Sequence, residues 1–361
     1  FCVCAAAGWP VFAMALSGRA ARRIGEATGH PASTIAGFLT RFDPKTAPER
    51  AVVVIDEASM LDLPAAYRLI RHLPAAYRFV LVGDPHQLPP VGPGLLLHEL
   101  AHQDGIPRVE LQQVKRYFGA IADAANAIRV GHWPDLPDDP SRPIAFVPCG
   151  SGEINDIVLD LLADDPDGTQ VLCAVRNAAA GGVKTINLLG QERLNAAGEE
   201  LMLWSQEFDQ RQGTGLRIGD PVICLANDWE KNLQNGSLGT LLSVEPPMPN
   251  PEPGRVLGRI LWDDGIERDL THDMLPNLEL AYAITIHKAQ GSQFRRIIIP
   301  VTKSRLLDRT LLYTAITRAQ QQVILVGDVA VAKASVEAPP HASLRQVALG
   351  AMLDEILEGM A

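Results

Sequence analysis

Short runs of almost uninterrupted apolar residues recur along the chain and predict buried β-strands. They lie at Val11–Leu16, Val52–Ile55, Phe79–Val82, Gln170–Val175, Ile297–Val301 and Val323–Val326. Runs of this length without polar alternation are typical of parallel strands that are covered on both faces. Between them, Ile154–Leu162 and Leu344–Leu357 are amphipathic at the spacing of helices. Asp62, followed by Pro64, predicts a capped helix that runs towards His72. Alternating strands and helices predict an α/β fold.

One segment, residues 215–276, has short alternating stretches that are typical of antiparallel strands. These are Asp220–Ala226, Leu238–Val244, Val256–Trp262 and Ile266–Leu270. Asn-Gly at 235–236 and Asp-Gly at 264–265 are strong signals for the turns of hairpins. We therefore expect a small β-barrel inserted into the α/β body. The chain then divides into a first α/β domain at 1–135, a second at 136–214 and 277–361, and the barrel at 215–276.

Composition and charge narrow the class of protein. The 361 residues are 47% hydrophobic and 20% charged, which indicates a folded chain rather than a disordered or collagen-like one. The formal net charge of −10 argues against a protein that coats nucleic acid or an anionic membrane. Five cysteines without a CxxC pair argue against a disulfide framework or zinc ribbon and favour the reducing cytoplasm.

The first 18 residues carry no charge. A signal peptide has basic residues before its apolar stretch, and none stand there in this chain. Gly8-Trp9-Pro10 divides this stretch. We therefore expect the end of a buried helix, a turn and a buried strand there, and no contact with a membrane.

Carboxylates and a glutamine follow two of the predicted strands and give the first indication of chemistry. Asp56 and Glu57 come at the end of the second apolar run, and Asp84 and Gln87 follow the third. The carboxyl ends of neighbouring parallel strands form the ligand-binding edge of open α/β sheets. There an aspartate can hold Mg²⁺, a glutamate can deprotonate water and a glutamine can contact a γ-phosphate. Asp56 and Glu57 alone would also suit an exposed strand end, but the four residues together predict a centre for nucleotide hydrolysis.

Six segments in the expected order resemble the motifs of superfamily 1 DNA helicases of the RecD-like group, the group of the alpha subunit of ATP-dependent exodeoxyribonuclease. IDEAS at 55–59 resembles the Walker B motif, and VGDPHQLPPVGPG at 82–94 resembles motif III. Motifs Ia, IV, V and VI are matched by the segments 15–35, 109–131, 278–294 and 311–328. The resemblance implies two RecA-like P-loop NTPase domains with parallel sheets and an inserted SH3-like β-barrel.

The same resemblance implies which residues act on ATP and which contact DNA. Catalytic roles are expected for Glu57, Asp56, Gln87, Arg116 and Arg318, with Asp56 as the ligand of Mg²⁺. Contacts with ATP are expected from Asp56, Asp84, Gln87, Arg116, Gln290, Gly291 and Arg318. Contacts with DNA are expected from Ser17, Gly18, Arg19, Thr34, Pro89, Thr285, His287 and Lys288. ATP and Mg²⁺ are therefore the expected cofactors, and single-stranded DNA is the expected partner.

A local excess of positive charge agrees with a DNA-binding role. Between Thr285 and Gln320 there are seven basic residues and one acidic residue, Asp308. A groove lined by such a stretch can hold a single strand even in an acidic protein. We therefore expect the residues of this stretch to form a DNA-binding face.

The resemblance implies an ATP-dependent 5′–3′ DNA helicase or single-strand translocase in recombination or repair, working with subunits of a recombination or nuclease complex. Two alternatives stay open: the helicase part of a conjugative relaxase, and a non-catalytic module that binds single-stranded nucleic acid. The chain contains no GxxxxGK[ST] phosphate-binding loop, which relatives carry one helix before the strand at Val11–Leu16. We therefore expect the chain to begin after that loop and to be inactive alone.

Overall fold

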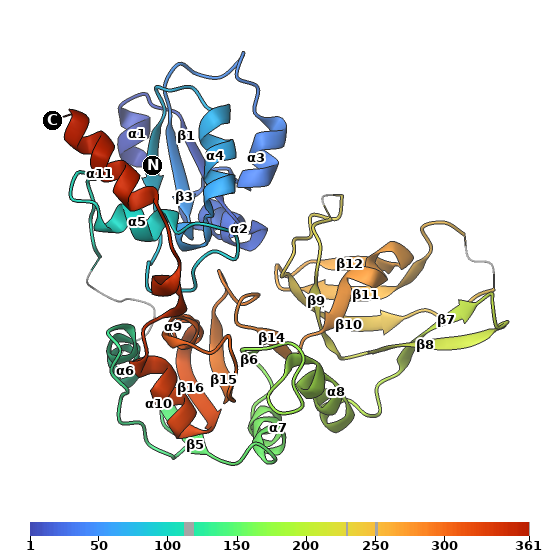
Figure 1. Ribbon diagram of the computed structural model, residues 1–361. Helices are drawn as coiled ribbons and strands as arrows, with labels where there is room; N and C mark the ends of the chain where they lie inside the picture. Colours follow the sequence, from blue (N-terminus) through green and yellow to red (C-terminus); the bar gives the residue numbers. More distant parts are fainter. Residues whose placement is uncertain (112–118, 229, 250–251, 361) are drawn as a thin grey trace.

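The computed structural model describes residues 1–111, 119–228, 230–249 and 252–360 (Figure 1). It contains two parallel sheets, one above the other in Figure 1, and an antiparallel region that extends to the right. The two parallel sheets confirm the predicted α/β fold. We call residues 1–111 the first body, residues 119–199 with 281–344 the second body, and residues 200–280 the β insert.

The first body is built on a parallel sheet with the strand order β2-β1-β3-β4. Its strands are β1 (Val11–Ala15), β2 (Ala32–Thr34), β3 (Val52–Asp56) and β4 (Arg78–Leu81). Its helices are α1 (Cys2–Ala6), α2 (Gly18–Thr28), α3 (Ile35–Arg41), α4 (Leu63–His72) and α5 (Leu96–His102), with a short 3-10 helix η1 (Ala58–Met60). Ala13 and Ala15 pack against α2, whereas Met14 and Ile55 pack with α3, α4 and α5. The central strands are therefore apolar because helices cover both of their faces.

Strand β4 is the exception among the apolar strands, because its side chains are not buried. It forms the edge of the first sheet, and Phe79, Val80 and Val82 are 38%, 46% and 45% exposed. The prediction that this run is covered on both faces is therefore wrong. An apolar run shows that a strand can be buried, but among the described residues of this edge strand only Leu81 packs against the core of the first body.

The second body is built on a parallel sheet with the strand order β14-β6-β15-β16-β5. Its strands are β5 (Ile144–Pro148), β6 (Thr169–Cys173), β14 (Ala283–Thr285), β15 (Phe294–Val301) and β16 (Ala319–Gly327). Its helices are α6 (Ala120–Arg129), α7 (Ile154–Asp164), α8 (Val183–Leu194), α9 (Arg309–Ile316) and α10 (Val329–Glu337), followed by η3 (His341–Leu344). Ile297 and Ile299 pack with α6, α9 and α10, whereas Ile298 packs with α7 and α8. Alternate residues of one strand thus belong to the two apolar layers that cover the sheet.

The β insert combines a hairpin with an antiparallel sheet of strand order β12-β11-β10-β9-β13. The elements are β7 (Glu200–Ser205), β8 (Gln210–Arg217), β9 (Pro221–Cys224), β10 (Leu238–Val244), β11 (Val256–Trp262), β12 (Glu267–Thr271), η2 (His272–Asn277) and β13 (Leu278–Leu280). The predicted strands and the Asp264-Gly265 turn are confirmed, with Gly265 at a φ of 76°. Leu201 and Leu278 join Trp262 in one core, so the hairpin and β13 belong to the same unit. The description as an SH3-like barrel and the division into three domains stay predictions.

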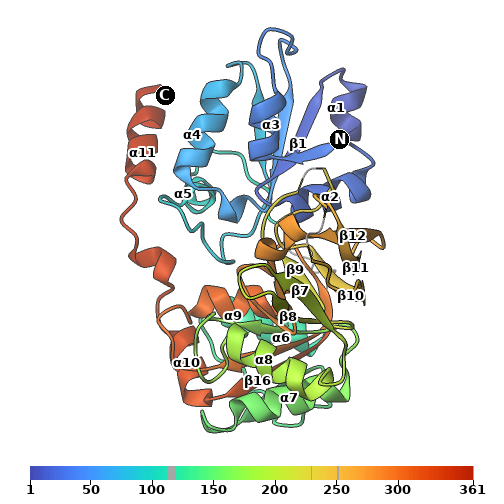
Figure 2. The same ribbon diagram turned by 90° about the vertical axis from the view of Figure 1, so that its right-hand side faces the viewer.

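Two helices are confirmed and two segments differ from expectation. Asp62 caps α4 by accepting a hydrogen bond from the Ala65 backbone (2.8 Å), and α7 covers the predicted segment. The expected helix at Leu344–Leu357 instead begins later, as α11 (Leu349–Met360). Arg345 donates to the Pro90 carbonyl (2.8 Å), and α11 lies beside α5 of the first body (Figures 1 and 2). The extended residues before α11 thus let the chain return to the first body.

The start of the chain differs from the expected buried helix. Helix α1 has only five residues, and Val3 is 82% exposed. All five cysteines are free thiols. In the part of the chain that the structure describes, no helix combines the length and the apolar character needed to cross a membrane.

A buried aspartate joins the β insert to the second body. The fully buried carboxylate of Asp220 accepts hydrogen bonds from the side chains of Gln191 (2.5 Å), Asn195 (2.7 Å) and Tyr282 (2.8 Å). It also accepts one from the Arg217 backbone (2.7 Å). Gln191 and Asn195 lie at the end of α8, and Tyr282 precedes β14. Four donors therefore replace the water that this charge has lost.

We predict that Asp220→Ala lowers the free energy of unfolding by about 3 kcal/mol, because the buried side chains of Gln191 and Tyr282 and the half-buried side chain of Asn195 then lose their acceptor. Chemical denaturation measures this loss. Asp269→Ala is the control, since Asp269 is 54% exposed on β12 and should change stability by less than about 0.5 kcal/mol. Equal losses in the two variants would contradict the role of Asp220 as the joint.

Candidate functional site

The end of strand β3 holds two side chains that the sequence predicts for catalysis. Asp56 is the last residue of β3, and Glu57 follows it with a φ of 51°, a conformation that is uncommon for residues other than glycine. Asp56 Oδ1 accepts a hydrogen bond from the Glu57 backbone (2.9 Å), and the Ala58 backbone donates to the Val82 carbonyl (2.9 Å). These bonds hold the unusual turn in place. Glu57 therefore leaves the strand in a fixed direction at the edge of the sheet.

The loop that follows β4 carries Asp84 and Gln87 and touches helix α9 of the second body. The Tyr313 hydroxyl donates to Asp84 Oδ2 (2.8 Å). The Leu88 backbone donates to the Thr314 hydroxyl (2.8 Å). Tyr313 and Thr314 are neighbours in α9, so this loop is held against the second body by two adjacent contacts.

Arg318 strengthens this connection, because its guanidinium reaches two of the predicted catalytic residues. Its Nη2 donates to Gln87 Oε1 (2.7 Å), and its Nη1 lies 3.7 Å from Glu57 Oε1. Arg318 lies two residues after the end of α9, and its Nε donates to the Thr314 carbonyl within that helix (3.3 Å). The Arg318 side chain is fully buried and that of Glu57 is 15% exposed, so water screens this charge pair weakly. The structure thus brings Glu57, Gln87 and Arg318 together from three separate motifs.

Asp56 is suited to hold a cation beside this group. Its Oδ1 accepts a backbone hydrogen bond, and among the described residues its carboxylate makes no ion pair. Mg²⁺ in nucleotide sites takes one or two protein carboxylates and fills its other positions with water and phosphate oxygens. No cluster of three metal-binding side chains occurs in the described ranges, and such a site does not require one. The residues at the end of β3 therefore fit a nucleotide-bound Mg²⁺.

Two further residues predicted to contact ATP, Gln290 and Gly291, lie in the loop after β14. A third, Arg116, lies outside the described residues. Gln290 is buried, and the Gly291 carbonyl accepts a hydrogen bond from Arg23 of α2 (2.6 Å). The contacts of these three residues with ATP stay predictions.

Two residues predicted to contact DNA begin helices. The Ser17 hydroxyl accepts a hydrogen bond from the Ala20 backbone (3.1 Å) and caps α2. The Thr34 hydroxyl accepts one from the Gly37 backbone (3.0 Å) and caps α3. A capped helix start still presents backbone N–H groups that favour phosphate. Their capping roles are therefore compatible with the predicted contact with DNA.

Helix α2 also brings the predicted DNA-contacting segments of the two bodies together. Arg19 donates to the Ser292 hydroxyl (2.6 Å) and to the Gly236 carbonyl (3.1 Å). A Cβ on Gly18 would lie 2.3 Å from the Gln234 side chain, so glycine allows the close approach. The start of α2 therefore lies against both the loop after β14 and the β insert.

The remaining predicted DNA contacts lie around the end of β14 and in the loop after β4. Thr285 Oγ1 accepts a hydrogen bond from the Lys288 backbone (3.3 Å). Burial lowers the pKa of His287, which keeps its imidazole neutral at pH 7. Burial also lowers the pKa of Lys288, whereas Glu279 raises it from 3.8 Å away. Pro89 is half-buried beside Leu88.

The basic stretch between residues 285 and 320 does not form one face, so that prediction is wrong. Arg318 is buried between the two bodies. Arg296 is buried and donates to the Leu161 carbonyl (2.8 Å), whereas Arg295 pairs with Asp165 (2.6 Å). Successive residues of a strand point to opposite faces of a sheet, so a run in the sequence becomes dispersed in space.

Two hydroxyl side chains of this site are absent from the predicted set. Tyr313 and Thr314 lie in α9, where every residue from Thr310 to Ile316 is buried. The sequence does carry a signal for them, because a hydroxyl inside an apolar helix needs a hydrogen-bond partner. Their partners, Asp84 and the Leu88 backbone, lie more than two hundred residues away in the sequence.

Comparison with known families agrees with this geometry. Residues 2–138 match the family described as AAA domain, and residues 280–326 match the family described as UvrD-like helicase C-terminal domain. The first match contains Glu57 and Gln87, and the second contains Arg318. The first match begins at residue 2 and therefore gives no support to the expectation that the chain alone is inactive.

Among curated proteins, the chain is similar to the ATP-dependent RecD2 DNA helicase of Deinococcus radiodurans. The two are 31% identical over 340 residues, which cover 89% of this chain and 43% of the relative. The RecBCD enzyme subunit RecD of Mycolicibacterium smegmatis is 30% identical over 317 residues, covering 79% of this chain and 51% of that protein. The chain thus spans about half the length of the curated relatives it matches.

Among solved structures, the fold is similar to that of the Pif1 helicase from Bacteroides in complex with ADP-AlF3 and single-stranded DNA. The TM-score is 0.56 at 21% identity, and the match covers 93% of this chain and 86% of that one. The fold, the order of the motifs and the two family matches agree with one another. The chain belongs to the RecD-like superfamily 1 helicases.

Proposed function

We propose that the protein is an ATP-dependent DNA helicase that moves along single-stranded DNA and hydrolyses ATP between its first and second bodies. The observation that carries the proposal is the meeting of Glu57, Gln87 and Arg318. These are the residue types that phosphoryl transfer requires, and they come from both sides of one contact. Similarity to a protein named ATP-dependent RecD2 DNA helicase supports the same assignment.

Each residue of this group has a chemical task in hydrolysis. Glu57 accepts a proton from the attacking water, and Gln87 orients that water. Arg318 offsets the negative charge that spreads over the γ-phosphoryl oxygens, and Arg116 adds a second positive charge. Mg²⁺ held at Asp56 would supply charge neutralisation to the phosphate oxygens. Since Arg318 contacts Glu57 and Gln87 in this structure, ATP has to exchange those contacts for its own oxygens.

The DNA-binding side of the proposal rests on the meeting of α2 with the loop after β14. Ser17, Arg19 and Lys288 offer a hydroxyl, a guanidinium and an ammonium group, all of which bind phosphate oxygens. We further propose two RecA-like domains with an SH3-like barrel at 215–276, a 5′–3′ direction and a role in recombination or repair in the cytoplasm. Association with a recombination or nuclease complex is supported by similarity to a RecBCD enzyme subunit.

We predict that Glu57→Gln abolishes ATP turnover while ATP binding is retained. Glutamine keeps the size of the side chain but cannot accept the proton, so the rate should fall by at least about 100-fold. The assay is hydrolysis of ATP by the full-length protein with and without single-stranded DNA. Glu267→Gln, a side chain 52% exposed on β12, is the control and should keep the parental rate.

Retained turnover in Glu57→Gln would remove Glu57 as the base. Failure of the parental full-length protein to hydrolyse ATP with single-stranded DNA would overturn the proposed function itself.

We also predict that Arg318→Lys lowers the rate of ATP hydrolysis by about 1,000-fold, because an ammonium group cannot reach Gln87 and Glu57 together. The affinity for single-stranded DNA should stay unchanged, which separates this effect from unfolding. Arg259→Lys is the control, since Arg259 is 61% exposed in the β insert. A parental rate in Arg318→Lys would exclude a catalytic role for the guanidinium.

A further inference from the structure

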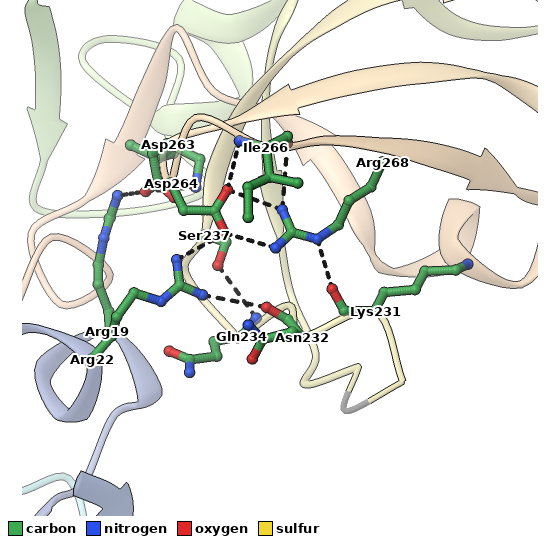
Figure 3. Close-up of polar contacts among 11 residues, drawn as sticks. Arg19, Arg22, Lys231, Asn232, Gln234, Ser237, Asp263, Asp264, Ile266 and Arg268 are labelled. Carbon is green, nitrogen blue, oxygen red and sulfur yellow. Dashed lines mark hydrogen bonds and ion pairs between the residues drawn. The ribbon is translucent and has the colours of Figure 1, made fainter. Parts of the chain in front are cut away.

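Helix α2 of the first body faces the turn between β11 and β12 of the β insert, and charged side chains fill the contact (Figure 3). Arg19 and Arg22 come from α2, whereas Asp263 and Asp264 come from the turn. Each arginine pairs with one of the two aspartates. The contact thus joins two parts of the molecule that are more than two hundred residues apart in the sequence.

Arg19 is held from three sides. It forms an ion pair with Asp263 and donates to the Ser292 hydroxyl (2.6 Å) and to the Gly236 carbonyl (3.1 Å). Its side chain is 18% exposed and that of Asp263 is 28% exposed. Burial lowers the pKa of Arg19, and the charge of Asp263 opposes that shift. The residue expected to meet a DNA phosphate therefore already has an anionic partner within the protein.

Asp264, the partner of Arg22, is held in place by a second arginine from its own part of the chain, Arg268. Arg268 donates to both carboxylate oxygens of Asp264, at 2.9 and 2.7 Å, and the side chains of Arg268 and Asp264 are 10% and 11% exposed. The hydrogen bond from Arg268 lowers the pKa of Asp264, so the carboxylate is charged at neutral pH. Arg22 reaches the same carboxylate at 3.2 Å and donates to the Asn232 carbonyl (3.3 Å). The turn therefore presents a rigid negative charge to α2.

A third carboxylate of the β insert pairs with Lys288, which is also proposed to bind DNA phosphates. Glu279 of β13 lies 3.8 Å from the Lys288 ammonium group and also pairs with Arg176. Side chains from the β insert thus neutralise Arg19, Arg22 and Lys288.

The contact between α2 and the β insert is polar, which suits a contact that opens and closes. The apolar residues of α2 belong to a cluster within the first body, and the core of the β insert is a separate cluster. By contrast, Ile223, Leu225 and Leu238 of the β insert pack into the core of the second body, and Asp220 is bonded there. The β insert is therefore anchored to the second body and meets α2 through charges.

We propose that the turn at Asp263 and Asp264 is an acidic latch: it occupies Arg19, a predicted DNA contact, and the nearby Arg22 of α2, and it must be displaced when single-stranded DNA binds to these two arginines. Carboxylate and phosphate oxygens offer a guanidinium the same charge-assisted hydrogen bonds, so the two ligands exclude each other. The proposal rests on the DNA-binding role proposed above. It assigns the β insert an inhibitory contact with Arg19 and Arg22.

The test compares Asp263→Asn/Asp264→Asn with Glu267→Gln/Asp269→Asn in the full-length protein. Both double variants remove two negative charges from the same part of the β insert. Glu267 and Asp269 are 52% and 54% exposed and lie near Arg259 of the adjacent strand rather than near α2. The two proteins therefore have the same net charge and differ in whether the latch is intact.

The affinity for a fluorescein-labelled oligo(dT), measured by anisotropy without ATP, is expected to rise about tenfold in the latch variant, which corresponds to the loss of two partly buried ion pairs. The control variant should rise far less. Hydrogen exchange without DNA gives an independent readout: residues 18–28 should exchange faster in the latch variant than in the parent. Asp263→Asn alone provides a milder version in which Asp264 and Arg268 stay paired.

Faster exchange with unchanged DNA affinity would overturn the competition, because the contact would open without uncovering a binding site. Unchanged exchange would show that the aspartates do not hold α2, and an equal gain of affinity in the control would assign the effect to net charge alone. If neither the parent nor the latch variant binds oligo(dT), the proposed DNA-binding role fails and the competition fails with it. Binding that is equally tight in both would overturn the latch alone.

Discussion

A guanidinium removed from water is unfavourable in a folded protein unless other groups compensate its charge and accept its N–H groups. Arg318 is fully buried in the second body, and two of the groups that compensate it, Glu57 and Gln87, come from the first. The arginine is therefore stable only while the two bodies stay close. A ligand that offers phosphate oxygens between them competes for the same guanidinium. Binding of ATP at the proposed site would then directly change the contacts of Arg318 that hold the two bodies together.

The contact of the first body with the β insert also depends on arginines whose charge is compensated by groups from another part of the molecule. Arg19 and Arg22 meet aspartates across a polar contact, whereas the β insert is joined to the second body by apolar packing and by the buried Asp220. Apolar contacts keep their strength in the absence of ligand, while ion pairs can be exchanged for other anions. Two anionic ligands, ATP at Arg318 and DNA at α2, would therefore act on two sets of contacts of one body. This arrangement offers a physical route for coupling hydrolysis to movement along a strand.

Much of the fold could be predicted from the sequence, because apolar runs and turn residues are local signals. The strand at Val52–Ile55 and the Asp264-Gly265 turn were readable in this way, and so was the strand end that carries Glu57. The features that could not be predicted depend on contacts between residues that are distant in the sequence. The exposure of Phe79 results from its place at a sheet edge, and the pairing of Arg19 with Asp263 from the packing of two bodies. A motif indicates the type of chemistry that a residue can perform. It does not indicate which other residue the side chain contacts when no ligand is bound.

The contact between α2 and the β insert shows one effect of the acidic residues that give the protein its net negative charge. A permanently open basic surface binds any polyanion, since phosphate contacts carry no sequence information. Here carboxylates fixed in the fold act on the cations at a high effective concentration, because they are tethered beside them. A single free anion competes poorly with such tethered groups. A DNA strand would compete better, since its successive phosphates would bind Arg19, Arg22 and Lys288 together. The carboxylates of the β insert would thus favour extended single strands over isolated phosphates, and the acidic insert would act as a selective cover over Arg19, Arg22 and Lys288.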